Sequence, residues 1–402
     1  MEKIIVAGAG YAGVIATKEL TKHGQSVVLI NAQPYHQLTT WLHEAAGGRN
    51  RVDDYKIELK ELFPDRNVQI IVDEIKMLDW KNKLIIGNKD VYPYDYAVVG
   101  LGSTPEYFNI EGLNANSLPL NSLESARVIR RQIENEFKKF TKDYDLLHLR
   151  VVVCGAGLTG VEFIGELVEW LPVEIICVEA MPDILPMLPN HLRDLAQHEL
   201  ERAGVKFMTN STIVRVEKQK ITLASGDVIH AGTIVWTGGV RAHPLLKESG
   251  LSCDRKGRAR VQETLQSVND DRIWIVGDCA NLERAGKPLP PTAQLATQMG
   301  KLAAINVMRV LQGEKQELFI PKIYGTLASL GHARGVGDVI GVRASGRFAG
   351  VFKELTKVKY LWQIGGMRLV KRKRKTNAFQ VEGKEDQTGG TFVVFRNSGH
   401  PQ

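Results

Sequence analysis

Two glycine-rich segments with the pattern G-x-G-x-x-G constrain the fold of this chain more than any other feature. The first consists of Gly8, Gly10 and Gly13, and the second of Gly155, Gly157 and Gly160. Each follows a short β-branched run and precedes a helical run, an arrangement that places a dinucleotide pyrophosphate at a helix N-terminus. Because the whole pattern occurs twice, 147 residues apart, we predict two dinucleotide-binding folds and two bound nucleotides.

The residue that ends the second strand of each fold indicates which nucleotide binds there. In the second fold, strand 174–178 ends on Glu179, whose carboxylate suits a ribose 2′-hydroxyl and repels a 2′-phosphate, so NADH is favoured. In the first fold, strand 26–30 ends on Asn31, an amide where an acid is usual. An amide still hydrogen-bonds a ribose, and an N-terminal fold of this kind most often holds FAD.

Further segments are candidates for contact with these nucleotides. Segments 94–102 and 233–240 are strands that run into glycines, so Gly102 and Gly238 would permit close approach, and the two halves resemble copies of one plan. Asp278 follows strand 272–276, where its carboxylate could accept from a ribityl hydroxyl. Segment 34–48 is either a surface loop or a loop that contacts FAD.

A helix is predicted to begin after two prolines at 290 and 291, with Thr292 as its N-cap. Its N-terminus would point at the flavin ring, where the helix dipole favours negative charge. Gln294 and Gln298 lie four residues apart and share one face of this helix. Single glutamines are usually solvated, but two on a helix that starts at a cofactor are better candidates for ligand contacts.

The net charge of +7 is concentrated in one segment. Between Arg343 and Lys375 there are eleven Lys or Arg and one Glu, a net charge of +10, so the rest of the chain carries −3. Apolar residues recur there at helical spacing until Gly365 and Gly366 interrupt them: Phe348, Val351, Phe352, Leu355, Val358, Leu361 and Trp362. No apolar run reaches the ~18 residues that a membrane span needs.

This segment admits three interpretations. It is a helix packed on the protein body with a solvated basic tail, a monotopic anchor on an anionic lipid surface through Phe348–Lys375, or a nucleic-acid site at 371–375. The third lacks a recognition fold, so no nucleic-acid partner is expected. The charge and the apolar spacing together favour the lipid anchor.

These motifs together resemble the flavoproteins with two dinucleotide-binding domains, and within them the type II NADH:quinone oxidoreductases. The matching stretches are VAGAGYAG, YHQLTTWLHEAAGG, YDYAVVGLGS, GAGLTGVEFIGEL, VEA, VWTGGVR, IWIVGDCA and PPTAQLATQMG. The last carries the A-Q-x-A-x-Q pattern that faces the quinone in this family. The resemblance covers residues 1 to about 375 and not the polar tail.

The resemblance implies an α/β fold with two Rossmann-like domains, for FAD and for NADH, and a C-terminal amphipathic segment that associates with the membrane. The expected boundaries are 1–115 and 261–335 for the two parts of the FAD domain, 116–260 for the NADH domain, 336–375 for the anchor and 376–402 for the tail.

The resemblance also assigns residues to roles. Contacts to FAD are expected from Gly8, Gly10, Tyr11, Ala12, Gly13, Asn31, Ala32, Thr40, Gly102, Asp278, Ala293 and Gln294. Contacts to NADH are expected from Gly155, Gly157, Gly160, Glu179 and Gly238. Glu162 resembles the family's active-site glutamate near the nicotinamide, although an acid at a helix N-terminus is also favoured by the dipole alone. Gln294 and Gln298 would contact the quinone.

The implied reaction is oxidation of NADH through FAD by a membrane quinone, without proton pumping, at the cytoplasmic side of the cell membrane. A homodimer is compatible with the sequence, and no metal site is expected. Cys154, Cys177, Cys253 and Cys279 form no redox-active pair, which argues against sulfide:quinone oxidoreductases and disulfide reductases. The alternatives are a non-respiratory FAD/NADH reductase and a non-catalytic redox sensor, for which Asn31 and Trp41 leave room.

Overall fold

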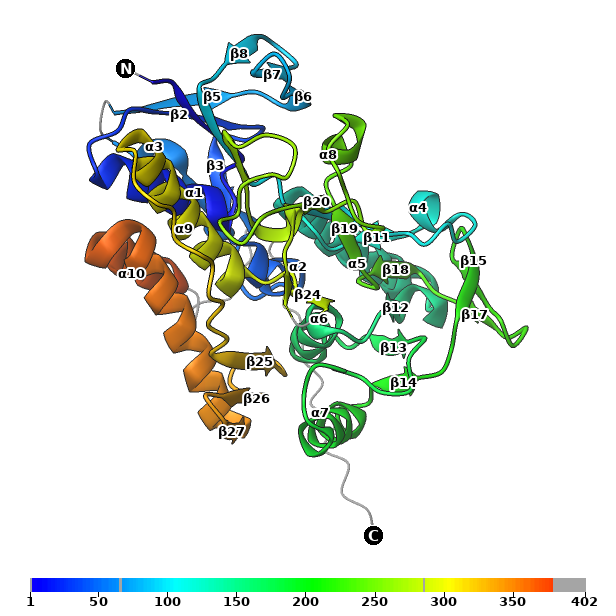
Figure 1. Ribbon diagram of the computed structural model, residues 1–402. Coiled ribbons are helices and arrows are strands. Elements are labelled where there is room, and N and C mark those ends of the chain that lie inside the picture. Colours follow the sequence, from blue (N-terminus) through cyan, green and yellow to red (C-terminus); the bar gives the residue numbers. More distant parts are fainter. Residues whose placement is uncertain (1, 65–66, 285, 379–402) are drawn as a thin grey trace.

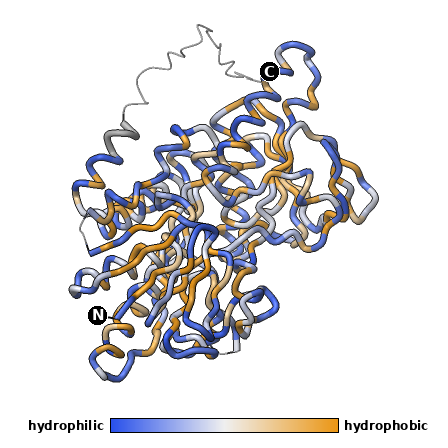
Figure 2. The backbone as a smooth tube through the Cα atoms, turned by 90° about the horizontal axis from the view of Figure 1, so that it is seen from above, coloured by the Kyte–Doolittle hydropathy of each residue, from blue (hydrophilic) through white to orange (hydrophobic). Residues whose placement is uncertain are grey.

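The protein has two halves, each built on a parallel five-stranded sheet (Figure 1). The structure is a computed structural model that describes residues 2–64, 67–284 and 286–378, and only the backbone of residues 374–378. Most of the expected tail, 376–402, therefore lies outside the described residues. The apolar strands run through the interior of each half (Figure 2), as expected for parallel sheets that are covered on both faces.

The first sheet has the strand order β21-β9-β1-β2-β5, and all neighbouring pairs are parallel. Its strands are β1 (Ile4–Ala7), β2 (Val27–Asn31), β5 (Val68–Val72), β9 (Tyr96–Val99) and β21 (Ile273–Ile275). Helix α1 (Tyr11–Lys22) joins β1 to β2, and α9 (Ala293–Leu311) follows β21 and packs on α1. Two distant stretches of the chain therefore build this half.

The second sheet repeats the plan with the order β11-β18-β12-β13-β14. Its strands are β11 (Leu118–Pro119), β12 (Arg150–Cys154), β13 (Glu174–Val178), β14 (Lys206–Met208) and β18 (Thr233–Trp236). Helix α6 (Leu158–Trp170) connects β12 to β13, as α1 connects β1 to β2. The predicted α/β class with two Rossmann-like folds is confirmed.

Each half also carries a three-stranded antiparallel sheet, which extends the repeat. These sheets are β6 (Ile75–Asp79), β7 (Leu84–Gly87) and β8 (Val91–Pro93) in the first half, and β15 (Ile213–Glu217), β16 (Lys220–Leu223) and β17 (Val228–His230) in the second. The two halves also contain β4 (Lys56–Glu58), β10 (Ser103–Pro105), β19 (Val240–Ala242), β20 (Ala259–Arg260), β22 (Ala280–Asn281), β23 (Glu283–Arg284), β24 (Lys287–Pro288), α3 (Leu59–Leu62), α4 (Leu113–Asn116), α5 (Leu123–Asp143), α7 (Asn190–Arg202) and α8 (Leu245–Glu248).

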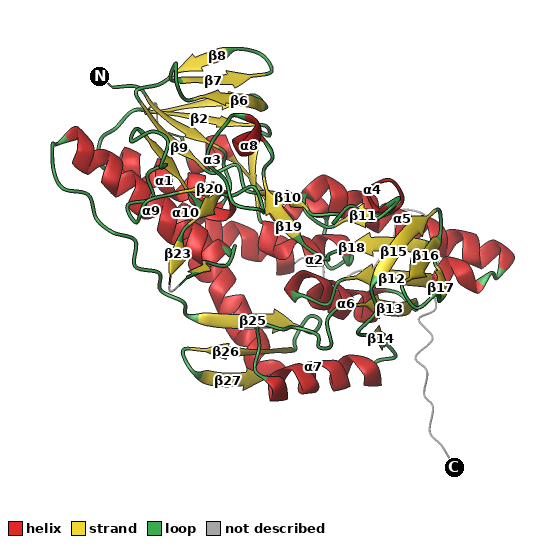
Figure 3. Cartoon of the chain, turned by 45° about the vertical axis from the view of Figure 1, so that its right-hand side comes forward, coloured by secondary structure: helices red, strands yellow, loops and turns green. Residues whose placement is uncertain are grey.

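A C-terminal part packs on both halves. It consists of the antiparallel sheet β25 (Gly325–Ser329), β26 (Gly335–Val339) and β27 (Val342–Ser345), followed by α10 (Gly346–Ala378) (Figure 3). Gly366 interrupts α10 with non-helical angles, φ 63° and ψ −166°, which confirms the break predicted from the glycine pair. Among the described residues, none of the helices has the length and apolarity needed to cross a bilayer.

Segment 34–48 differs from the predicted loop. It contains β3 (Tyr35–Gln37), a 3₁₀ turn at Thr39–Trp41 and α2 (Leu42–Ala46), and α2 is entirely buried. It lies directly on α6, because a Cβ at Gly47 would be only 2.2 Å from the Cβ of Glu166. A Cβ at Gly48 would likewise meet the ring of Trp170 at 2.4 Å. His43 and Glu44 therefore belong to a buried contact between the halves, whereas Thr39 and Thr40 of the same segment are exposed.

Candidate active site

The two glycine loops have the same geometry. Gly8 and Gly155 have positive φ angles of 97° and 111°, which glycine adopts without strain. A Cβ at Gly13 would lie 1.8 Å from the oxygen of Gly8, and one at Gly160 would lie 1.9 Å from that of Gly155. These glycines are therefore required for the close packing of helix on strand.

The middle glycines, Gly10 and Gly157, face open space instead. They are the N-caps of α1 and α6, and neither helix has a side-chain cap or an acidic residue in its first turn. The first amide groups of both helices are thus left without side-chain acceptors. Two cradles of this kind fit the pyrophosphate groups of FAD and NADH.

Asn31 and Glu179 occupy equivalent positions after the second strand of each half. Oδ1 of Asn31 accepts from the amide of Ala9 at 2.8 Å, and Oε2 of Glu179 accepts from that of Ala156 at 2.6 Å. Both side chains therefore hold the glycine loop at the edge where a ribose would lie. The departure of the first fold from the usual acid preserves this hydrogen bond, since an amide oxygen accepts as a carboxylate does.

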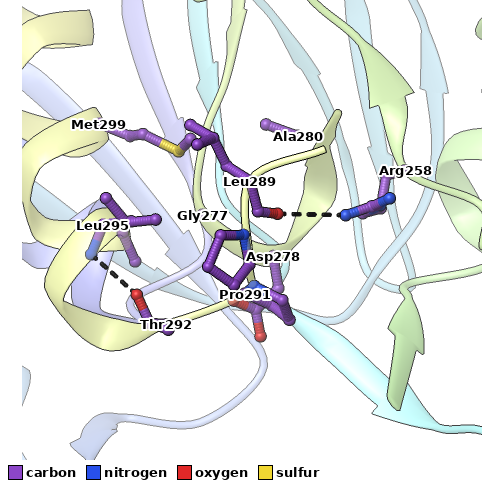
Figure 4. Close-up of a pocket in the computed structure, with 11 residues that line it drawn as sticks. Arg258, Gly277, Asp278, Ala280, Leu289, Pro291, Thr292, Leu295 and Met299 are labelled. Carbon is purple, nitrogen blue, oxygen red and sulfur yellow. Dashed lines mark hydrogen bonds between the residues drawn. The ribbon is translucent and has the colours of Figure 1, made fainter. Parts of the chain in front are cut away.

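A cavity beside the first glycine loop is lined by Arg258, Gly277, Asp278, Pro291, Thr292 and Met299, among others (Figure 4). Asp278 accepts from the hydroxyl of Ser103 at 2.8 Å, and burial raises the pKa of its carboxyl. Thr292 caps α9 as predicted, because its Oγ accepts from the amide of Leu295 at 3.3 Å. A partly buried acid and a helix N-terminus thus converge on one small cavity, where they fit a hydroxyl-bearing chain such as the ribityl group of a flavin.

Some of the residues expected to contact FAD lie near this cavity, and others contact one another. A Cβ at Gly277 would lie 3.6 Å from the Cβ of Ala12. Gly102 follows β9 with φ 74°, and a Cβ added there would meet no atom within 4 Å. The hydroxyl of Tyr11 contacts Oγ of Thr40 at 2.6 Å. Ala293 begins α9, and Ala32 is exposed beside Asn31. In the second half, Gly238 lies against the loop, since a Cβ at Gly155 would be 2.6 Å from its Cα.

Glu162 in α6 lies in a buried group of charges between the two halves and the C-terminal part. Its carboxylate is paired with Lys353 of α10 and accepts from the amide of Ser329 at 3.1 Å. Nδ1 of His43 lies 3.4 Å from Oε2 of Glu162. Burial alone would raise the pKa of Glu162, but Lys353 and His43 lower it below its usual value.

A second pair lies one turn further along α10. Lys357 is paired with Glu44 of α2 and lies 2.6 Å from Glu354. Burial opposes the charge on Glu44, but Lys357 and Arg49 offset it and lower its pKa to about 2. Burial lowers the pKa of the neighbouring His43 to about 4, so this histidine is neutral at pH 7. Two charged pairs therefore fasten α10 to the protein body.

No sequence motif indicates that His43, Glu44, Lys353 and Lys357 form one group. The two lysines are four residues apart on a helix, a spacing that places them on one face. That spacing is visible in the sequence, but it does not distinguish lysines that pair with buried acids from lysines that face lipid head groups. Their acidic partners lie more than 190 residues earlier, so only the fold reveals the pairing.

Gln294 and Gln298 lie on one face of α9, and both contact the segment before β25. The amide of Gln298 donates to the carbonyl of Lys322 at 2.8 Å and accepts from its N–H at 2.9 Å. Oε1 of Gln294 accepts from the N–H of Tyr324 at 2.8 Å. The two glutamines therefore tie α9 to an exposed segment in which Ile320 and Ile323 are 73% and 61% exposed.

The apolar face predicted for α10 is divided between protein and solvent. Leu361 is buried against the body, whereas an exposed stripe remains that consists of Phe348, Val351, Leu355, Trp362 and Met367. Lys353, Lys357 and Lys373 point inward, and Lys373 donates to the carbonyls of Asp54 and Lys56. The interpretation that these lysines face lipid head groups is wrong, because each has a partner in the protein.

Comparison with known proteins agrees with this architecture. Residues 2–300 match the family of pyridine nucleotide-disulphide oxidoreductases, the class that two stacked dinucleotide folds define. A type II NADH:quinone oxidoreductase of Staphylococcus aureus is 35% identical over 397 residues, which cover 93% of this chain and 98% of that protein, and one of Staphylococcus epidermidis is 34% identical over the same shares. The chain belongs to the family of type II NADH:quinone oxidoreductases.

Solved structures with low sequence identity share the fold. The structure of NDH2 from Plasmodium falciparum in complex with NADH has a TM-score of 0.84 at 18% identity, covering 94% of this chain and 98% of that one. The sulfide:quinone oxidoreductase of Aquifex aeolicus has a TM-score of 0.77 at 17% identity, covering 91% of this chain and 92% of that one.

Three of the four cysteines, Cys154, Cys177 and Cys279, are buried free thiols. Burial raises the pKa of Cys154 and Cys279 to about 12, so these two thiols are poor nucleophiles.

Proposed function

We propose that this protein oxidises NADH and reduces a membrane quinone to quinol, with FAD as the carrier and without proton pumping. The observation that carries the proposal is the pair of equivalent glycine cradles, held by Asn31 in one half and Glu179 in the other. The named activity of its 35% identical relatives supports the same reaction. Residues 1–115 and 261–335 would form the FAD domain, and residues 116–260 the NADH domain.

In this proposal the first cradle holds FAD. The amides behind Gly10 would bind its pyrophosphate, Asn31 and Ala32 would lie at its ribose, and Asp278 would accept from the ribityl chain. Tyr11, Ala12, Thr40, Gly102 and Ala293 would enclose it. When bound, FAD supplies a carrier that takes a hydride from the nicotinamide and passes two electrons to the quinone. The chain's own residues hold, orient and shield this carrier.

The second cradle binds NADH as the substrate. The amides behind Gly157 would bind its pyrophosphate, and Glu179 would accept from the ribose 2′-hydroxyl, which disfavours NADPH by charge repulsion. Gly238 packs against this loop, and a Cβ there would meet the ring of Trp236 at 2.4 Å. Glu162 stands two residues after Gly160 and lies between the halves, so it would orient the nicotinamide or transfer a proton.

The quinone would enter from the lipid side. The exposed stripe on α10 and the exposed side chains of Ile320 and Ile323 present apolar surface that a membrane would cover. Gln294 and Gln298 lie immediately beneath the segment that carries Ile323, so an entering quinone would meet their amides. The protein would sit peripherally on the cytoplasmic face of the membrane, with the exposed basic residues of the second α10 segment near anionic lipid.

Anaerobic half-reactions test this function. NADH should bleach the flavin of the purified protein, and a soluble quinone added afterwards should restore its colour. A flavin that NADH bleaches and quinone does not reoxidise would contradict quinone reduction and favour a redox sensor. A flavin that NADPH bleaches as readily as NADH would contradict the role of Glu179.

A further inference from the structure

The two glycine loops differ at one peptide group. In the second half, the carbonyl of Ala156 accepts from the backbone N–H of Leu185 at 2.9 Å. In the first half, the equivalent carbonyl of Ala9 lies 2.8 Å from Nδ1 of His36, a side chain. A carbonyl only accepts, so Nδ1 of His36 must carry a proton. A side chain therefore holds the loop of the first cradle, whereas a backbone amide holds that of the second.

His36 connects this loop to α10. It is fully buried, and burial lowers its pKa to about 4, so it carries one ring proton at pH 7. With that proton on Nδ1, Nε2 is an acceptor, and the hydroxyl of Tyr360 lies 2.9 Å from it. A continuous chain of donors thus runs from Tyr360 of α10 through His36 to the carbonyl of Ala9.

Two further contacts join the same part of α10 to the first cradle. The ring of Tyr360 lies 4.5 Å from that of Tyr11, the first residue of α1, centroid to centroid. Nζ of Lys18, two turns later in α1, donates to the carbonyls of Gln363 and Ile364 at 2.6 and 3.1 Å. These carbonyls lie just before the break at Gly366, and the last carbonyls of a helical segment need partners from outside the helix. Lys18 therefore caps the first segment of α10.

We propose that α10 is a clamp on the pyrophosphate loop of the first cradle, with His36 and Tyr360 as positioning residues, so that docking of α10 and retention of FAD are coupled. This inference rests on the proposed function in one respect, namely that the first cradle holds FAD. The coupling is reciprocal by linkage, so bound FAD should also tighten the docking of α10. The docking of the helix that carries the apolar stripe would thus depend on whether FAD is bound.

The test compares FAD release from the full-length protein and its variants. Tyr360→Phe keeps the ring against Tyr11 and removes only the donor to His36. One neutral hydrogen bond predicts FAD release about fivefold faster, followed by the rise in flavin fluorescence. Trp362→Phe is the matched control, because Trp362 lies two residues away on α10 and is 59% exposed. Its release rate should equal that of the wild type.

A double-mutant cycle tests whether the two residues act as one path. His36→Ala should speed release more than Tyr360→Phe, and the double variant should match His36→Ala alone. The affinity for NAD⁺ should stay within about twofold in all variants, because the second loop is held by Leu185 and the Lys353–Glu162 pair is untouched. Unchanged FAD release in Tyr360→Phe, or an equal loss of NAD⁺ affinity, contradicts the clamp.

Hydrogen exchange supplies a second measurement that does not depend on release rates. Adding FAD to flavin-free protein should slow amide exchange in residues 357–364 of the wild type and much less in Tyr360→Phe. Equal protection in both proteins contradicts the coupling. A wild type that binds no flavin at all contradicts the proposed function instead, which keeps the two failures distinguishable.

Discussion

Lys353 of α10 is paired with Glu162 of α6, which joins the C-terminal helix to the residue expected beside the nicotinamide. Glu162→Gln would remove the negative charge and leave the ammonium of Lys353, which is 17% exposed, without its partner. We expect a loss of about 2 kcal/mol in the free energy of unfolding, below the ~3–5 kcal/mol of a fully buried pair. Urea denaturation measures this.

The matched variant is the double substitution Glu162→Gln with Lys353→Met, which removes both charges. It should recover most of the lost stability, because a neutral pair of similar volume needs no compensation in the interior. A double variant that is less stable than Glu162→Gln would contradict this explanation. The unpaired ammonium of Lys353 would then not be the cause of the stability lost in the single variant.

Stability should depend on pH through His43. Its pKa is lowered to about 4 by burial, so the folded protein binds fewer protons than the unfolded chain between about pH 6.5 and pH 4. Acid therefore favours unfolding in that window, by up to about 3 kcal/mol for this group. Glu166 acts in the opposite direction, because burial raises its pKa from 4.5 to about 7. The folded protein therefore binds more protons than the unfolded chain at this group between these pH values, and acid favours folding there.

Comparison of the wild type with His43→Gln isolates the histidine, since Glu44, Glu162, Lys353 and Lys357 surround both side chains. Relative to the variant, the wild type should lose stability as the pH falls from 6.5 to 4. Parallel stability curves of the two proteins across this window would rule out a buried neutral histidine.

The two glutamines should matter for one half-reaction only. Gln294→Ala with Gln298→Ala removes the hydrogen bonds to Lys322 and Tyr324 and the amides that a quinone would meet. We expect quinone to reoxidise the flavin about tenfold more slowly, while bleaching by NADH stays within about twofold. Lys301→Ala, an exposed site on the same helix, is the control. Equal slowing of both half-reactions would contradict the assigned roles.

The exposed stripe on α10 should govern attachment to lipid. Val351 and Leu355 are 59% and 54% exposed, and their replacement by serine removes apolar surface without touching the buried pairs. With roughly 1 kcal/mol lost for each of the two side chains, about 2 kcal/mol together, binding to anionic vesicles should weaken about thirtyfold in a sedimentation assay. Met181→Ser, equally exposed on the second half, should have no effect.

These point variants test attachment to lipid more specifically than removal of the whole segment does. Truncation at Gly346 should also release the protein from vesicles, but it would uncover Glu44 and Glu162, whose lysine partners lie on α10. Sedimentation of the serine variant that equals that of the wild type would contradict the anchor.

Local signals predicted much of the fold and both cradles. The glycine spacing fixes Gly8 and Gly155 at positive φ, Thr292 caps α9, and Gly366 breaks α10, because each depends on a few neighbouring residues. Asn31 and Glu179 could be placed for the same reason, since each ends a strand next to its loop.

What the sequence did not predict depends on contacts between distant residues. Segment 34–48 has the polar composition of a loop, yet Gly47 and Gly48 allow it to pack on α6. His36 and His43 are therefore buried, although their residue type does not indicate it. Tyr360 lies 324 positions from His36, so no spacing rule connects them. Helical periodicity found the apolar residues of α10 but could not tell its protein-facing side from its exposed stripe.

The absorbance spectrum of the purified protein, before and after addition of NADH, tests the central claim most directly. The account predicts the yellow spectrum of an oxidised flavin that acid releases as about one FAD per chain, and bleaching of this spectrum by NADH under anaerobic conditions. A chain that stays colourless after gentle purification and reconstitution with excess FAD would contradict it.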